Sequence, residues 1–243
     1  MTKIIKHSNS FLPPLKMDNQ TIITNIEKAN AIANAFNSVY SSLSINSTSV
    51  EDCNVKLTLN ELNNQCNDKI DYTSPSEIKS IIHSLKNSKS PGNDNIHNLL
   101  LKHCPRNVHI LLTYLFNSCF SLSYFPYIWK HAIVIPIPKP FKDTSNPINY
   151  RPISLLCSLS KVFERIIQFR LLNHIETKQC LPNIQFGFRQ FHSTNHQVKR
   201  LAQTIKVNIN NKRSIGVVLL DVEKAFDCVW HEGLLFKFIK LDI

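Results

Sequence analysis

Glycine is scarce in this chain of 243 residues, which contains only Gly92, Gly187, Gly216 and Gly233. Globular proteins use glycine at about 7% of positions. The phosphate-binding loops of P-loop kinases and of dinucleotide-binding enzymes need several glycines close together, because the backbone must approach the phosphates. No such cluster occurs here, so the sequence excludes both classes.

Closely spaced cysteine pairs are also missing, although the chain has seven cysteines. Metal-binding cysteines come in such pairs, so no zinc site is expected. Scattered cysteines in odd number indicate reduced thiols of an intracellular protein. No apolar run reaches the roughly 18 residues of a membrane span, and residues 1–10 are too polar for a secretory leader. We therefore expect an intracellular protein, cytoplasmic or nuclear, without membrane contact.

Acidic residues are too few in the second half of the chain to balance its basic residues. The formal net charge is +11, and residues 121–243 hold 17 Lys/Arg against 8 Asp/Glu, whereas residues 1–120 hold 11 against 9. A polyanion is the simplest partner for this surplus, and nucleic acid is favoured over a membrane surface because no basic amphipathic segment stands out. Solubility alone is the alternative explanation of the basic charge.

The first half of the chain has the signals of packed helices. Thr-Asn-Ile-Glu at residues 24–27 fits a capping box, and Ser-Pro-Ser-Glu at residues 74–77 repeats the signal with proline at the first helical position. Apolar residues follow both at helical spacing. A third helical stretch, residues 95–122, is interrupted at Pro105. These patterns predict helices that pack against one another.

From residue 129 the chain changes character. Residues 131–138 are β-branched with two prolines, which suits an edge strand, and residues 150–156 look extended. The two segments are predicted to pair as an antiparallel hairpin. Its polar loop, residues 139–149, would carry Lys139 and Lys142 as an outward-pointing basic finger.

Two amphipathic helices and a strand are expected after the hairpin. Apolar residues at helical spacing from Leu159 to Leu171 predict the first helix, and Thr194 with Gln197 opens the second. Residues 214–222 then form an apolar run that ends at Asp221, which predicts a buried strand presenting a carboxylate at its end. Such a carboxylate suits a Mg²⁺ ion that also binds phosphate oxygens.

Five short blocks in this order resemble one family, the reverse transcriptases of non-LTR retrotransposons of the jockey-like and LINE-like kind. A single block is weak, but five in order over about 140 residues are specific. The blocks are Ser-Pro-Gly-Asn-Asp at 90–94, Trp-Lys at 129–130 with Ile-Pro-Ile-Pro-Lys-Pro at 135–140, Tyr-Arg-Pro-Ile-Ser-Leu at 150–155, Gln-Phe-Gly-Phe-Arg at 185–189 and Leu-Asp-Val-Glu-Lys-Ala-Phe-Asp at 220–227.

The resemblance implies an α+β right-hand polymerase fragment with an incomplete palm sheet and no thumb. Residues 1–89 would be a helical lead-in, and residues 90–243 the fingers and the start of the palm. Asp221 matches the first metal-binding aspartate of the palm, where the Val222 carbonyl can join it in binding Mg²⁺. A strand-ending aspartate that only caps the next helix is the alternative, and Asp227 is expected to be structural.

The resemblance also implies contacts to the incoming deoxynucleoside triphosphate. Arg151 matches the arginine of the fingers that lies against the nucleotide and can bind triphosphate oxygens. Lys139, or Lys142 by reach of the loop, would supply a second cation. Phe226 falls where the family places an aromatic ring beneath the sugar, which would select deoxynucleotides. Solvated charges and ordinary core packing are the respective alternatives.

A further block would bind the template. Gln185, Gly187, Phe188 and Arg189 match the segment of the family that lies along the template strand, with Gly187 permitting close backbone approach and Arg189 contacting phosphate. A turn with an exposed arginine is the alternative. The expected partners are therefore an RNA template, a DNA primer and deoxynucleoside triphosphates.

The paired aspartates that complete the metal site in the family do not occur in these residues, as neither Tyr-Ala-Asp-Asp nor Phe-Ala-Asp-Asp is found. We therefore expect a truncated polymerase that is inactive by itself. A non-catalytic remnant that binds RNA or DNA, and a helical domain that binds protein partners only, are the alternatives. The predicted strand would lack neighbours, which predicts aggregation or local disorder near the C-terminus.

Overall fold

The computed structural model describes residues 12–17, 20–41, 55–59, 70–222, 225–226 and 229–241. The chain divides into two compact units. The first comprises Met1–Thr48 and Cys66–Ile166, and the second comprises Ser49–Gln65 and Ile167–Ile243. Each is described by itself.

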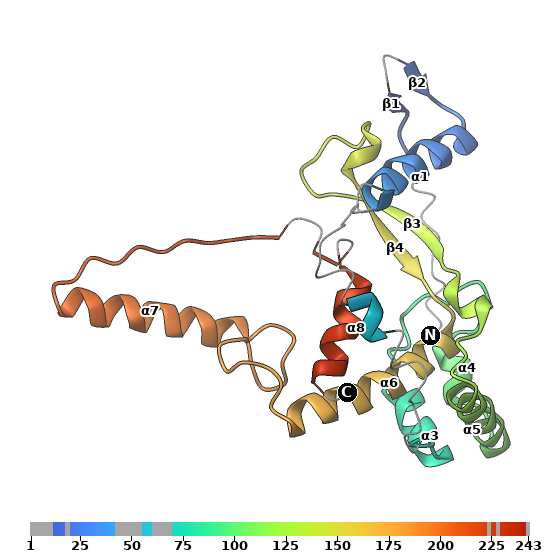
Figure 1. Cartoon of the computed structure of the whole chain (residues 1–243). Coiled ribbons are helices and arrows are strands. Elements are labelled where there is room, and N and C mark those ends of the chain that lie inside the picture. The colour runs from blue at the N-terminus through green and yellow to red at the C-terminus, as the bar shows by residue number, and fades with distance from the viewer. Residues whose placement is uncertain are drawn as a thin grey trace, which may run out of the picture. The chain divides into compact units, whose positions relative to one another are not determined.

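The core of the first unit is helical, and it confirms the helices expected around residues 74–85 and 95–122. It gathers α3 (Pro75–Ser84), α4 (Asn98–Lys102), α5 (Arg106–Ser121), the 3-10 helix η1 (Tyr127–Lys130) and the start of α6 (Ser158–Thr177) (Figure 1). Aromatic rings fill the centre, where Phe116 stacks on Phe163 with 5.4 Å between ring centroids. Edge-to-face and stacked ring pairs add to the stabilisation from buried area.

Local capping explains where these helices begin. The Ser74 hydroxyl accepts the backbone N–H of Glu77 at 3.2 Å, and Pro75 occupies the first turn, as predicted. The capping box at the start of α1 (Asn25–Ser41) is confirmed in part: Thr24 Oγ1 accepts the Glu27 N–H at 3.4 Å, and the Glu27 carboxylate accepts the Thr24 hydroxyl at 2.6 Å. These bonds satisfy backbone donors that have no partner within the helix.

Two hairpins complete the first unit. The predicted hairpin is confirmed: β3 (Ile133–Pro138) and β4 (Tyr150–Leu155) pair antiparallel, with Ile133 opposite Leu155 and Pro138 opposite Tyr150. A smaller hairpin of β1 (Leu15–Met17) and β2 (Gln20–Ile22) was not expected. Its Leu15 packs with Tyr150 and with residues of α1 in a second small core.

The turn at residues 90–94 is held against the junction of β4 and α6. A Cβ atom added to Gly92 would lie 2.5 Å from the Cys157 nitrogen and 2.6 Å from the Leu156 oxygen, so only glycine fits between these backbone atoms. Lys161 Nζ donates to the Ser90 carbonyl at 3.3 Å from α6. This block therefore orders the base of the hairpin.

The second unit contains the end of α6, α7 (Thr194–Asn210) and α8 (His231–Lys240). The predicted helix at residue 194 is confirmed, but its cap is one residue earlier, since the Ser193 hydroxyl accepts the His196 N–H. None of the side chains of α7 is buried. No described helix is both long and apolar enough to cross a membrane.

The prediction of a buried strand at residues 214–222 is wrong. These residues are described as a segment without helix or strand, and all of them are exposed. A strand exists only where a neighbouring strand accepts and donates its backbone hydrogen bonds. Among the described residues no segment pairs with residues 214–222, so the apolar run remains unpaired.

Candidate nucleic-acid and nucleotide site

The three cations predicted to bind the triphosphate all lie on the β3–β4 hairpin. Arg151 is the second residue of β4, lies opposite Ile137 and has an exposed side chain. Lys142 is exposed in the loop. The Lys139 ammonium instead donates to the Ile148 carbonyl at 2.9 Å across the loop, so it is held against the backbone and does not point outward. Of the three predicted cations, Arg151 and Lys142 are thus the accessible ones.

The loop between these strands is shaped by a carboxylate. The Asp143 carboxylate accepts the Ser145 N–H at 2.9 Å and the Ser145 hydroxyl at 2.7 Å, and these bonds, together with the charge of Lys16, hold the pKa of Asp143 below its usual value. Burial and the nearby Asp143 charge raise the pKa of Tyr150, whose hydroxyl donates to the Thr144 carbonyl at 2.7 Å. Hydrogen bonds to the ionised form thus order the loop beside Lys142.

The predicted template-binding block forms a turn just before α7. Gln185 N–H donates to the Pro182 carbonyl at 3.0 Å. The Arg189 guanidinium donates to the same carbonyl at 3.3 Å, so its side chain folds back over the turn. Gly187 is exposed, and a Cβ atom added there would meet nothing within 4 Å. The space beside Gly187 is therefore open to a ligand.

The second unit brings two predicted site residues together. The rings of Phe188 and Phe226 lie edge to face, with 6.0 Å between centroids. Phe188 is 92% exposed and Phe226 is 80% exposed, so neither ring is core packing. Phe188 also has a positive φ of 57°, and residues other than glycine, asparagine and aspartate rarely adopt such a φ. An exposed aromatic pair, of which Phe188 lies on a strained turn, is a platform suited to a base or a sugar.

Sequence reasoning did not single out Arg200. Its guanidinium carbon lies 5.9 Å from the centroid of the Phe186 ring, within the range of a cation–π contact. Phe186 also meets His192 edge to face at 5.0 Å. The signal available in the sequence was the Lys199–Arg200 pair on the helix that follows the template-binding block.

Asp221 and Val222 are both exposed. Glu223 and Asp227 lie outside the described residues. Within the described part of the chain, no group of three or more His, Cys, Asp or Glu residues is placed to hold a metal ion. Mg²⁺ needs near-octahedral oxygen coordination and gives up its waters reluctantly, so Asp221 with one carbonyl does not by itself fit such an ion.

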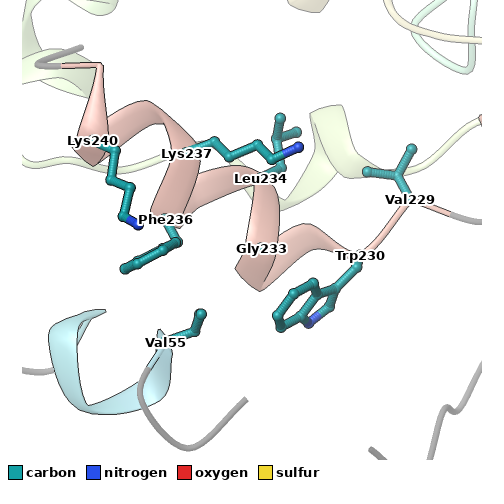
Figure 2. Close-up of a pocket in the computed structure, with 8 residues that line it drawn as sticks. All are labelled: Val55, Val229, Trp230, Gly233, Leu234, Phe236, Lys237 and Lys240. Atoms are coloured by element: carbon teal, nitrogen blue, oxygen red, sulfur yellow. The ribbon is translucent and has the colours of Figure 1, made fainter. Parts of the chain in front are cut away.

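A pocket of about 680 Å³ lies in the second unit, and none of its lining residues is a predicted site residue. Figure 2 shows α8 on one side and Val55, from the helical segment at residues 55–59, on the other. An added Cβ atom at Gly233 would collide with the Trp230 ring, so that ring would have to move. Lys240 Nζ lies 4.5 Å from the centroid of the Phe236 ring. The lining is mostly apolar and without carboxylates, which gives it no metal chemistry.

The family profile for reverse transcriptase (RNA-dependent DNA polymerase) matches residues 137–243. This range contains β4, the template-binding block and Asp221.

Relatives from Drosophila melanogaster match a longer part of the chain. The probable RNA-directed DNA polymerase from transposon X-element is 43% identical over 163 residues, and the one from transposon BS is 44% identical over 165 residues. The RNA-directed DNA polymerase from mobile element jockey is 39% identical over 161 residues. The matches cover 67%, 68% and 66% of this chain but only 18% of each relative. The chain belongs to the reverse transcriptase family, in the group from non-LTR mobile elements such as jockey.

Proposed function

We propose that this chain supplies part of an RNA-directed DNA polymerase of a non-LTR mobile element. Residues 1–89 form its helical lead-in, and residues 90–243 form the fingers and the start of the palm. The observation that carries the proposal is the ordered set of five sequence blocks, the last three of which lie wholly within the residues that match the reverse transcriptase family. The names of the relatives support an RNA template, a DNA primer and deoxynucleoside triphosphates as partners.

On the β3–β4 hairpin, Arg151 and Lys142 bind the triphosphate. Their side chains are exposed, and a guanidinium can bind phosphate oxygens with two parallel hydrogen bonds. Lys139 joins them only if it releases the Ile148 carbonyl. That exchange replaces a neutral acceptor with a charged one, which makes a stronger hydrogen bond.

In the second unit, the aromatic pair Phe188 and Phe226 orients nucleotide and template. The Phe226 ring lies beneath the sugar and excludes a 2′-hydroxyl, while Phe188, with Gln185, Gly187 and Arg189, contacts the template strand. The edge-to-face contact of the two rings supports this proposal, because it links the residue assigned to the nucleotide with one assigned to the template.

Asp221 contributes one oxygen ligand, and the Val222 carbonyl another, to a two-metal site that these residues do not complete. Mg²⁺ in such a site neutralises charge that develops on the phosphates. Since the 243 residues contain no paired-aspartate turn, we propose that this chain alone does not polymerise and that the remaining ligands must be supplied.

A non-catalytic nucleic-acid-binding remnant is the second candidate. The excess of 17 basic over 8 acidic residues in residues 121–243 favours it, because phosphate contacts need charge but no metal ligands. The two candidates differ in one respect, which is whether Asp221 acts in nucleotidyl transfer.

The test is a chimera in which residues 137–243 replace the matching segment of the jockey polymerase, assayed by primer extension on an RNA template. The chimera should extend the primer, and Asp221→Asn should reduce the rate at least about 10²-fold, as loss of a charge-stabilising group does. Glu176→Gln, a similar charge loss at an exposed position of α6, should leave the rate unchanged. A folded chimera without activity, or one insensitive to Asp221→Asn, would favour the second candidate.

A further inference from the structure

A basic pocket in the first unit has no part in the function proposed above. It has a volume of about 500 Å³ and is lined by residues of α3, α4 and α5 and the turn between the last two. Its lining residues are Pro75, Ser76, Lys79, His83, Lys102, Cys104, Arg106 and His109. Five of these eight carry or can acquire a positive charge, and none is acidic.

The local sequence explains which of these side chains lie together on each element. Pro75, Lys79 and His83 are spaced by four residues, so they share one face of α3. Lys102 is the last residue of α4, and Arg106 is the first residue of α5. The short turn between them brings both cations to the same opening. The acidic residue of α3, Glu77, does not line the pocket and accepts the Thr73 hydroxyl at 2.6 Å.

The start of α5 adds to the positive potential. Its N-cap position is Pro105, which provides no side-chain hydrogen bond, and its first turn has no acidic residue. An uncapped helix start carries a partial positive charge and free N–H donors. In a helix of 16 residues this dipole acts together with the Arg106 side chain.

His109 is an independent sign of an unfilled site. Its side chain lines the pocket, only 5% of it is exposed, and its buried Nε2 atom has no hydrogen-bond partner. Burial, Lys79 and His83 lower the pKa of His109. A buried polar atom without a partner is costly, and so is positive charge without a counter-ion. An anion in the pocket would relieve both.

We propose that this pocket binds a phosphate group, held by Lys79, Lys102 and Arg106 with His109 at its base. Several cations, a free helix start and the absence of carboxylates match the oxyanion chemistry of phosphate. The phosphate can belong to a nucleic-acid backbone or to a free phosphate or nucleotide. The site does not depend on nucleotidyl transfer and requires no metal.

The first experiment follows the His109 imidazole by NMR in the 243-residue protein, with its signal assigned by its absence in His109→Gln. Inorganic phosphate, compared with chloride at equal ionic strength, should raise the pKa of His109, because a bound anion offsets the charge of Lys79 and His83. Lys102→Gln/Arg106→Gln should abolish this rise, whereas Lys89→Gln, at an exposed position outside the pocket, should preserve it. Circular dichroism checks that each variant is folded.

A second variant guards against a folding defect in the first. Lys79 lies on a different helix from Lys102 and Arg106. Lys79→Gln should raise the pKa of His109 before phosphate is added, and it should reduce the further rise in that pKa when phosphate is added. The proposal is overturned if phosphate leaves the His109 pKa unchanged, if the double variant responds like the unaltered protein, or if Lys89→Gln loses the response equally.

A short single-stranded RNA identifies the source of the phosphate. If RNA raises the His109 pKa and binds several-fold more weakly to Lys102→Gln/Arg106→Gln than to Lys89→Gln, the ligand is a backbone phosphodiester. If inorganic phosphate alone produces the shift, the ligand is a free phosphate or nucleotide. Both outcomes support the phosphate site, and neither requires the polymerase proposal to hold.

Discussion

At the scale of single residues, Gly92 and Gly187 are two glycines from the sequence blocks with opposite surroundings. An added methyl group at Gly92 would collide with backbone atoms of Leu156 and Cys157, whereas one at Gly187 would meet open space. Gly92→Ala should therefore lower the free energy of unfolding by about 1–3 kcal/mol through overpacking. The matched change Gly187→Ala should alter it by less than about 0.5 kcal/mol. Urea unfolding measures both, and equal effects would contradict the assignment of Gly92 to packing.

At the scale of elements, α3 and α7 are both amphipathic, but only α3 buries its apolar face. Ile82 in α3 is 0% exposed and Ile209 in α7 is 62% exposed. Ile82→Ala removes buried methyl groups and leaves a cavity, which should cost about 2–5 kcal/mol. Ile209→Ala should change the free energy of unfolding by less than about 0.5 kcal/mol. The comparison uses the same substitution in two helices, and a large loss at Ile209 would show that α7 packs against a surface in solution.

At the scale of the whole molecule, the basic surplus of residues 121–243 predicts salt-dependent binding of RNA. For single strands, log K should fall linearly with log salt with a slope of about −0.7 per phosphate neutralised. Lys199→Gln/Lys206→Gln, both exposed on α7, should reduce the magnitude of this slope by up to about 0.7 per lost contact. Lys86→Gln/Lys89→Gln, with the same charge change in the first half, should affect it less. Filter binding or fluorescence anisotropy gives the slope, and a flat salt response would favour a domain that binds protein partners only.

The sequence alone determined the family, the helices of the first half and the β3–β4 hairpin. Caps such as Thr24 with Glu27, proline at the start of α3 and the β-branched residues of β3 act between neighbours in the chain, so they can be recognised without knowledge of distant contacts. The strand expected at residues 214–222 was wrong because its existence depends on a partner strand and not on its own residues.

Only the tertiary structure decided what distant residues do together. It placed Gly92 against the β4–α6 junction, held the Lys139 ammonium on the Ile148 carbonyl, and paired Phe188 with Phe226. It also assembled Lys79, Lys102, Arg106 and His109 around one pocket. The spacing of these residues in the sequence indicates no common site, because their convergence depends on how three helices pack around a shared apolar core.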